Sequence, residues 1–138
     1  MKILGVIVGA VILVWAIVLL SSPSLQPQPP KAETQTRDDR QLLLMTSGAV
    51  TLKQNMRNPD SFKLESAFIV GSTEAVCYEY RSQNGFGGMN RGKAVLAGTK
   101  FETNETSGFV KLWNKECANK AGSERGDLVR RAMERLSR

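Results

Sequence analysis

One uncharged apolar segment near the start of the chain constrains everything that follows it. Residues 3–20 are eighteen residues without a charged side chain, and no second run of this kind occurs. At about 1.5 Å per residue, a helix of this length spans roughly 27 Å, which is close to the thickness of the hydrocarbon core of a bilayer. We therefore expect residues 1–21 to form a single transmembrane anchor.

A cleaved secretory signal is the main alternative to an anchor, and a buried core helix is a third interpretation. Signals have an apolar core of about 7–15 residues followed by small residues at the cleavage site. Here the run is longer, and Pro23 disrupts the junction after Ser22, whereas cleavage after Ser24 stays open. Lys2 lies on the short amino-terminal side, and the far flank is uncharged up to Lys31. The positive-inside rule then places the N-terminus in the cytoplasm and the rest of the chain outside it.

Four of the five prolines follow the apolar run directly, at Pro23, Pro27, Pro29 and Pro30. Such a composition disfavours helices and strands and favours extended polyproline-like stretches. We therefore expect residues 22–37 to be a linker. The remaining residues 38–138 number about 100, which suits one small domain with a single core.

Two helices are predicted from apolar residues that recur at spacings of three and four. The first spans residues 38–57 and ends before Pro59, and its apolar side consists of Leu42, Met45, Ala49, Leu52 and Met56. The second begins at Asp127, a residue that favours helix starts. Its apolar side consists of Leu128, Ala132 and Leu136.

Alternation of apolar and polar residues predicts four strands, over residues 62–70, 75–81, 93–97 and 109–113. The first two are separated only by the short break at residues 71–73, so we expect them to pair as an antiparallel hairpin. The predicted fold is α+β: a helix, a four-stranded antiparallel sheet and a C-terminal helix, with the helices on one face of the sheet.

The chain has two cysteines, Cys77 and Cys117, and no histidine. Outside the cytoplasm thiols are readily oxidised, and a disulfide that closes a loop of this size contributes roughly 4 kcal/mol in the chain-entropy model. We expect this disulfide; two buried thiols, or a reactive or metal-bound pair, are the alternatives. Two cysteines alone do not complete the four ligands of a structural zinc, so we expect no metal site and no cofactor.

Residues 84–93 contain four glycines and no acidic residue. The spacing from Gly87 to Lys93 fits a phosphate-binding loop. However, Ala94 replaces the hydroxyl residue that would hold magnesium, and a strand is predicted where a helix should follow. Two interpretations remain: a structural connection with Phe86 or Met89 turned down onto the sheet, or a recognition surface. The candidate recognition residues are Asn84, Gly85, Phe86, Gly87, Gly88, Asn90 and Arg91.

Four short motifs are distributed along the predicted domain. They are Asn-Pro-Asp-Ser-Phe-Lys at 58–63, Val-Cys-Tyr at 76–78, Asn-Gly-Phe-Gly-Gly at 84–88, and Trp113 with Cys117. Over about residues 40–120 this pattern resembles a group of small, exported or membrane-anchored bacterial proteins of no assigned activity. The resemblance implies a bacterial cell-envelope location and a paired Cys77 and Cys117. With the orientation given above, we expect the anchor in the inner membrane and the domain in the periplasm. It carries over no catalytic residue.

Catalytic candidates are few. Because histidine is absent, acid–base chemistry would fall to carboxylates such as Asp60, Glu65 or Glu79. Asp60 lies in a Pro-Asp-Ser turn, where such side chains commonly bond the backbone. Ser61 and Lys63 share a face of a predicted strand, which is a weak signal for a nucleophile and its base. We therefore expect no enzymatic activity and no small-molecule substrate.

Positive charge is concentrated toward the C-terminus. The chain has a formal net charge of +6, and residues 111–138 carry eight basic and four acidic side chains. Arg130, Arg131 and Arg135 form the candidate basic face of the C-terminal helix, for which a simple solvated face is the alternative. No aromatic residue lies among these arginines, so base stacking and hence nucleic-acid binding are not expected.

Two functional hypotheses follow. The first is a membrane-anchored binding or accessory protein of the cell envelope that meets another protein through the glycine-rich loop and the adjoining sheet edge. The second is a structural or stress-related domain that contacts anionic envelope polymers or lipid through the basic C-terminal helix.

Overall fold

The computed structural model describes residues 31–138, with side chains from Gln35 onward. The predicted anchor, residues 1–21, and residues 22–30 of the predicted linker lie outside the described residues. Among the helices of residues 31–138, none combines the length and the apolar character needed to cross a membrane.

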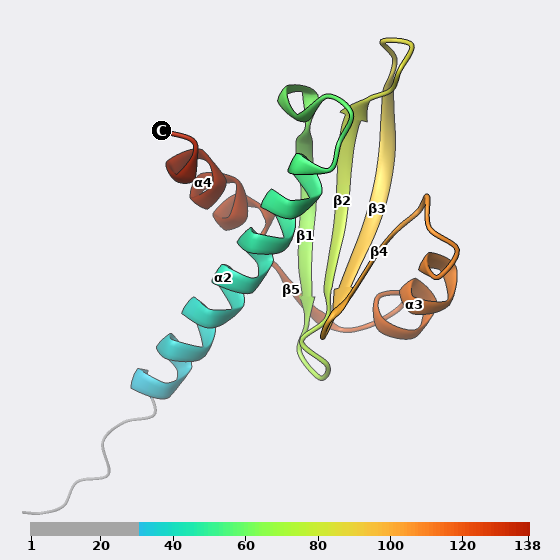
Figure 1. The fold of residues 1–138 in the computed structure, drawn as a ribbon. Coiled ribbons are helices and arrows are strands. Elements are labelled where there is room, and N and C mark those ends of the chain that lie inside the picture. Colours follow the sequence, from blue (N-terminus) through green and yellow to red (C-terminus); the bar gives the residue numbers. More distant parts are fainter. Residues whose placement is uncertain (1–30) are drawn as a thin grey trace, which may run out of the picture. The chain divides into compact units, whose positions relative to one another are not determined.

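A five-stranded antiparallel sheet forms the centre of the domain, with the strand order β4-β3-β2-β1-β5 (Figure 1). The predicted α+β class is confirmed, but the sheet has five strands where four were predicted. The strands are β1 (Lys63–Val70), β2 (Val76–Gln83), β3 (Met89–Ala97), β4 (Lys100–Thr103) and β5 (Gly122–Glu124). β4 and β5 were missed because four and three residues are too few for a recognisable alternation.

Three α-helices cover the two faces of the sheet within residues 31–138. α2 (Lys31–Gln54) and α4 (Gly126–Leu136) lie on one face, and α3 (Phe109–Glu116) lies on the other. The two predicted helices therefore lie on one face as expected, but the other face is covered by α3, which was not predicted as a helix. α2 begins at Lys31 rather than at 38, because no proline or glycine follows Pro30 to interrupt it. Residues 31–37 of the predicted linker are thus helical.

The segment predicted as a fourth strand, residues 109–113, forms helix α3 instead. Phe109, Leu112 and Trp113 follow helical spacing and pack against the sheet. The ring centroids of Phe109 and Trp113 lie 5.4 Å apart, as expected for a pair separated by one helical turn. A run of five residues fits both periods, so alternation alone could not distinguish strand from helix here.

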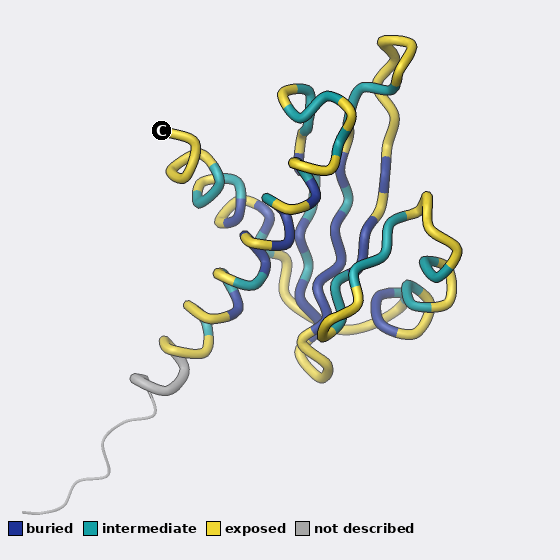
Figure 2. The backbone as a smooth tube through the Cα atoms, viewed as in Figure 1, coloured by how far each residue is buried: buried dark blue, intermediate teal, exposed yellow. Residues whose placement is uncertain are grey.

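The first layer of the core lies between the sheet and the pair α2 and α4 (Figure 2). Its fully buried side chains include Met45 and Leu52 of α2, Val129 of α4 and Tyr78 of β2. The Tyr78 hydroxyl donates a hydrogen bond to the Met45 carbonyl oxygen at 3.0 Å. The Tyr78 hydroxyl lies directly beside Gly48, where a Cβ atom would collide with the hydroxyl oxygen. This contact fixes the distance between α2 and the central strand.

The second layer lies between the sheet and α3. Val70 and Val95 are buried here, and the predicted disulfide between Cys77 of β2 and Cys117 is confirmed. Both cysteines are buried, and Cys117 follows the last residue of α3 directly. The disulfide therefore holds α3 against the sheet, although few residues of α3 itself are buried there.

Replacing both cysteines by alanine should lower the free energy of unfolding. The bond joins residues 40 apart in the sequence, and a loop of that length corresponds to roughly 4 kcal/mol in the chain-entropy model. Urea denaturation of the full-length chain measures this loss. Adding a reductant should destabilise the wild type and leave the double variant unchanged. An equal effect of reductant on both proteins would contradict the assignment.

The two buried tyrosines predict a loss of stability at alkaline pH. Burial raises the pKa of Tyr78 above its usual range. Burial, and then the charge of Glu105, raises that of Tyr80. Above about pH 10 the unfolded chain releases these protons while the folded chain retains them, so unfolding becomes more favourable as pH rises.

For Tyr78 alone the loss should be on the order of 1 kcal/mol at about pH 11 relative to about pH 8. Urea denaturation of wild type and Tyr78→Phe at both pH values measures it. Tyr78→Phe should start less stable, because it lacks the bond to Met45, and should lose less stability on going to alkaline pH. Identical pH dependence in the two proteins would refute the argument.

Candidate functional site

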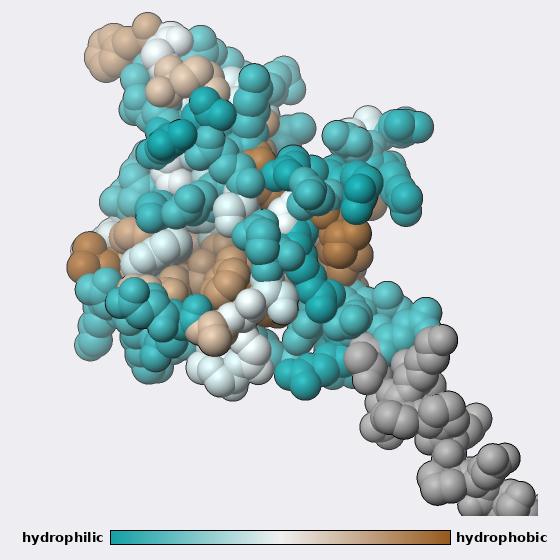
Figure 3. All heavy atoms as spheres, turned by 180° about the vertical axis from the view of Figure 1, so that it is seen from behind, coloured by the Kyte–Doolittle hydropathy of each residue, from teal (hydrophilic) through white to brown (hydrophobic). Residues whose placement is uncertain are grey.

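The β2–β3 hairpin, residues 83–91, projects beyond the rest of the sheet at one end (Figure 1). It does so because β4 pairs only with residues 94–97 of β3 and leaves the first part of that strand uncovered. Seen from behind, the projecting hairpin bears apolar surface at its end (Figure 3). All seven candidate recognition residues lie in this hairpin, from Asn84 to Arg91.

The turn is held by the side chain of Asn84. Its Oδ1 atom accepts hydrogen bonds from the backbone N–H groups of Phe86, at 3.0 Å, and Gly88, at 2.9 Å. The Asn84 N–H donates to the Gly88 carbonyl at 2.8 Å, which closes the loop. Gly87 has a φ angle of +87°, a conformation that residues with a Cβ atom rarely adopt. The asparagine and the glycine together define one conformation of the turn.

Phe86 is fully exposed at this turn, and Met89 is 48% exposed. The interpretation in which Phe86 turns down onto the sheet is therefore excluded. A large apolar side chain that contacts little of its own chain loses nothing on folding but gains on binding, which makes it a candidate anchor for a partner. Met89 was not among the candidate residues from the sequence, although its place two residues before Arg91 puts it on the same strand edge.

The base of the hairpin rests on the segment that follows α2. Asn58 Nδ2 donates to Gln83 Oε1 at 2.7 Å, and the Gln83 N–H donates to Ser61 Oγ at 2.8 Å. Ser61 lies in the 3₁₀ turn η1 (Pro59–Ser61). The guanidinium of Arg57 lies so close to Gly85 that a Cβ atom there would collide with it. These contacts support the hairpin from one side and keep it in line with the sheet.

The outer edge of β3 is open beside the hairpin. The Asn104 N–H donates to the Lys93 carbonyl at 3.0 Å, and Asn104 Oδ1 accepts from the Lys93 N–H at 2.9 Å. In an antiparallel strand, every second residue directs its backbone groups to the same side. Those of Met89 and Arg91 therefore point outward like those of Lys93, but within residues 31–138 no strand pairs with them.

The charged side chains near the hairpin form ion pairs across the sheet. Glu65 of β1 forms ion pairs with Arg81 at 2.5 Å and with Arg91 at 3.5 Å. Lys93 pairs with Glu79 at 2.8 Å and lies 4.9 Å from the ring centroid of Trp113. Since Arg91 already has a carboxylate partner, the hairpin offers an apolar and backbone surface rather than a strongly cationic one.

The candidate basic face of the C-terminal helix is divided by the structure. Arg130 Nη1 donates to the carbonyl oxygens of Leu64 and Glu65, each at 3.0 Å, and Arg130 also pairs with Asp127. Arg131 and Arg135 are exposed. Arg131 and Arg135 thus remain available to a polyanion, whereas Arg130 is engaged in hydrogen bonds to the backbone of β1.

The carboxylates considered for catalysis are not grouped. Glu65 and Glu79 are in the ion pairs just described, and Asp60 is exposed in η1. The Ser61 hydroxyl donates to the Asn58 carbonyl at 2.7 Å rather than to Lys63. Lys63 is exposed. In the described part of the chain, no three His, Cys, Asp or Glu side chains are placed as metal ligands would be.

Comparison with protein-family models, with curated proteins and with solved structures finds no match to this chain.

Replacing Asn84 by alanine should loosen the hairpin turn without unfolding the domain. The loss of two side-chain acceptor bonds, worth about 1 kcal/mol each, should speed hydrogen exchange of the Phe86 and Gly88 amides by roughly fivefold to thirtyfold. Asn104→Ala, which removes a similar bond to the backbone of Lys93, is the control. Unchanged exchange at both amides in Asn84→Ala would show that the side chain does not hold the turn.

Proposed function

We propose that this chain is a membrane-anchored, non-enzymatic binding or accessory protein of the bacterial cell envelope that meets a partner protein through the β2–β3 hairpin. The observation that carries the proposal is the full exposure of Phe86 on a turn of defined conformation. The anchor and the envelope location rest on the apolar run of residues 3–20 and on the charges that flank it.

Phe86 supplies affinity in this proposal. Burying a phenylalanine side chain that was exposed contributes about 1.5–3 kcal/mol. The turn around it is already ordered by Asn84, so little further conformational entropy is lost when a partner closes over the ring. A flexible loop with the same sequence would bind more weakly, because its ordering would oppose association.

The open edge of β3 supplies orientation. The outward backbone groups of Met89 and Arg91 can receive an extended segment of the partner as an added strand, a common mode of peptide recognition. Phe86 lies at the end of this edge, so one extended segment can contact the ring and the edge together. The alternative is contact of anionic envelope polymers or lipid with Arg131 and Arg135, which depends on charge and so weakens as salt rises.

Photocrosslinking in intact cells tests the hairpin contact. A photoreactive amino acid at Met89 of the full-length chain should yield a discrete protein adduct. Phe86→Ser should reduce that adduct by about tenfold or more, as expected from the loss of a buried aromatic anchor. The same photoreactive residue at Thr99, which is exposed at the opposite end of β3, should yield no such adduct.

In permeabilised cells the adduct at Met89 should persist at raised ionic strength, because its main contribution is apolar. An adduct unaffected by Phe86→Ser, or lost with salt and with Arg131→Gln/Arg135→Gln instead, would overturn the hairpin proposal in favour of the polyanion alternative.

A further inference from the structure

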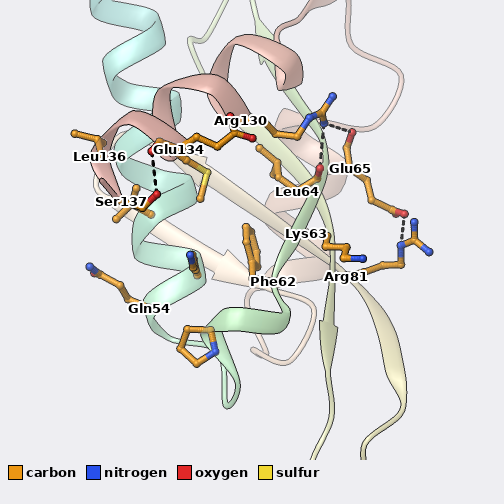
Figure 4. Close-up of a pocket in the computed structure, with 14 residues that line it drawn as sticks. Gln54, Phe62, Lys63, Leu64, Glu65, Arg81, Arg130, Glu134, Leu136 and Ser137 are labelled. Atoms are coloured by element: carbon orange, nitrogen blue, oxygen red, sulfur yellow. Dashed lines mark hydrogen bonds and ion pairs between the residues drawn. The ribbon is translucent and has the colours of Figure 1, made fainter.

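A second surface, separate from the hairpin turn, is a cleft between the ends of α2 and α4 and the start of β1 (Figure 4). Its volume is about 940 Å³, which lies within the range of small-molecule sites. Fourteen residues from these elements, from η1 and from β2 line it. No feature of the sequence pointed to it, because it forms only where elements distant in the sequence meet.

The interior of the cleft is apolar. It is lined by Phe62, which directly precedes β1, by Leu64 of β1 and by Met133 of α4, and Val50, Pro59 and Leu136 extend this surface. The Phe62 ring is fixed by stacking on Tyr80, with centroids 5.6 Å apart. Leu136 is 73% exposed although it lies on the amphipathic helix α4. The cleft thus leaves apolar surface open to solvent that a bound chain of methylene groups would cover.

The rim of the cleft is cationic on balance. Lys53, Lys63, Arg81 and Arg130 line it, against the two carboxylates Glu65 and Glu134. Arg81 shares the carboxylate of Glu65 with Arg91, and Arg130 pairs with Asp127. Within residues 31–138, Lys53 and Lys63 have neither an ion pair nor a side-chain hydrogen bond. Lys63 is the cross-strand partner of Arg81, so its side chain lies on the face of β1 opposite Leu64 and points toward Arg81 (Figure 4). Lys53 is therefore the unpaired ammonium group beside the apolar interior, and such a group is complementary to a molecule with an apolar body and an anionic end.

The strand edge that borders the cleft is closed to an added peptide strand. Arg130 occupies the carbonyl oxygens of Leu64 and Glu65, which lie at the irregularity in the pairing of β1 with β2. The Ala67 N–H is taken by Glu124 Oε1 at 3.1 Å. An extended peptide needs such groups for its own backbone, whereas an acyl chain needs none. The closed edge therefore favours an acyl chain over a peptide.

We propose that this cleft binds an anionic amphiphile, with its acyl chain against Phe62, Leu64 and Met133 and its head group at Lys53. A free fatty acid and an anionic phospholipid share this chemistry. The site makes no use of the hairpin turn, so it stands or falls independently of the partner contact proposed above.

Photolabelling of the full-length chain in neutral detergent tests the site. A palmitic acid that carries a diazirine on its chain should label peptides from residues 50–64 and 131–137. The matching palmityl alcohol, which lacks the charge, should label them less. Lys53→Gln should reduce labelling of these peptides by the acid by about twofold to fivefold. Lys100→Gln/Lys111→Gln, at exposed lysines of β4 and α3, should leave it unchanged.

Leu136→Glu provides a second variant that does not depend on the lysines. Its side chain is largely exposed, so the domain should fold normally, and the new charge should repel the head group and expel the chain. Labelling by a phosphatidylglycerol that bears the same diazirine chain also supports the proposal, and the stronger of the two probes identifies the source. Labelling confined to residues 1–30, or equal in all variants and for acid and alcohol, would overturn the proposal and leave the cleft to a peptide.

Discussion

Burial of β2 on both of its faces is the constraint on which the rest of the domain depends. Tyr78 and the neighbouring Cys77 point to opposite sides, and each fixes one helix: Tyr78 holds α2 through its bond to Met45, and Cys77 holds α3 through the disulfide. The helices cover only one end of this strand. Beyond Tyr80 no residue of β2 is buried, and there β2 and β3 continue into a projecting hairpin rather than into the core.

The two long edges left by this arrangement differ. On the β1 side, Arg130 and Glu124 satisfy the backbone groups of Leu64, Glu65 and Ala67, so side chains close that edge where β5 ends. On the β3 side, nothing in the described part of the chain closes the edge beside Met89. Proteins usually protect exposed edges from unwanted pairing. One closed and one open edge in the same sheet favour a specific use for the open one.

Elements with long, clear periodicity could be predicted from the sequence. Elements whose conformation is set by tertiary contacts could not. α2, β1, β2 and the disulfide follow from spacing and composition. Residues 109–113 were predicted as a strand because five residues fit both periods. β5 exists only because it pairs with residues 68–70 of β1. The hairpin was found through its glycines, but the cleft depends on the approach of Phe62 to Met133 across about seventy residues of sequence, which no local pattern encodes.

The turn η1 connects the two proposed sites. Ser61 and Asn58 support the base of the hairpin through Gln83, while Pro59 and Phe62 line the cleft. A ligand that packs against Phe62 therefore contacts the same short segment on which the hairpin rests. Substitutions in this segment would disturb both surfaces, so their effects could not be assigned to one of them. Exposed positions at the hairpin turn and at the rim of the cleft share no contacts, so substitutions there can test each surface independently.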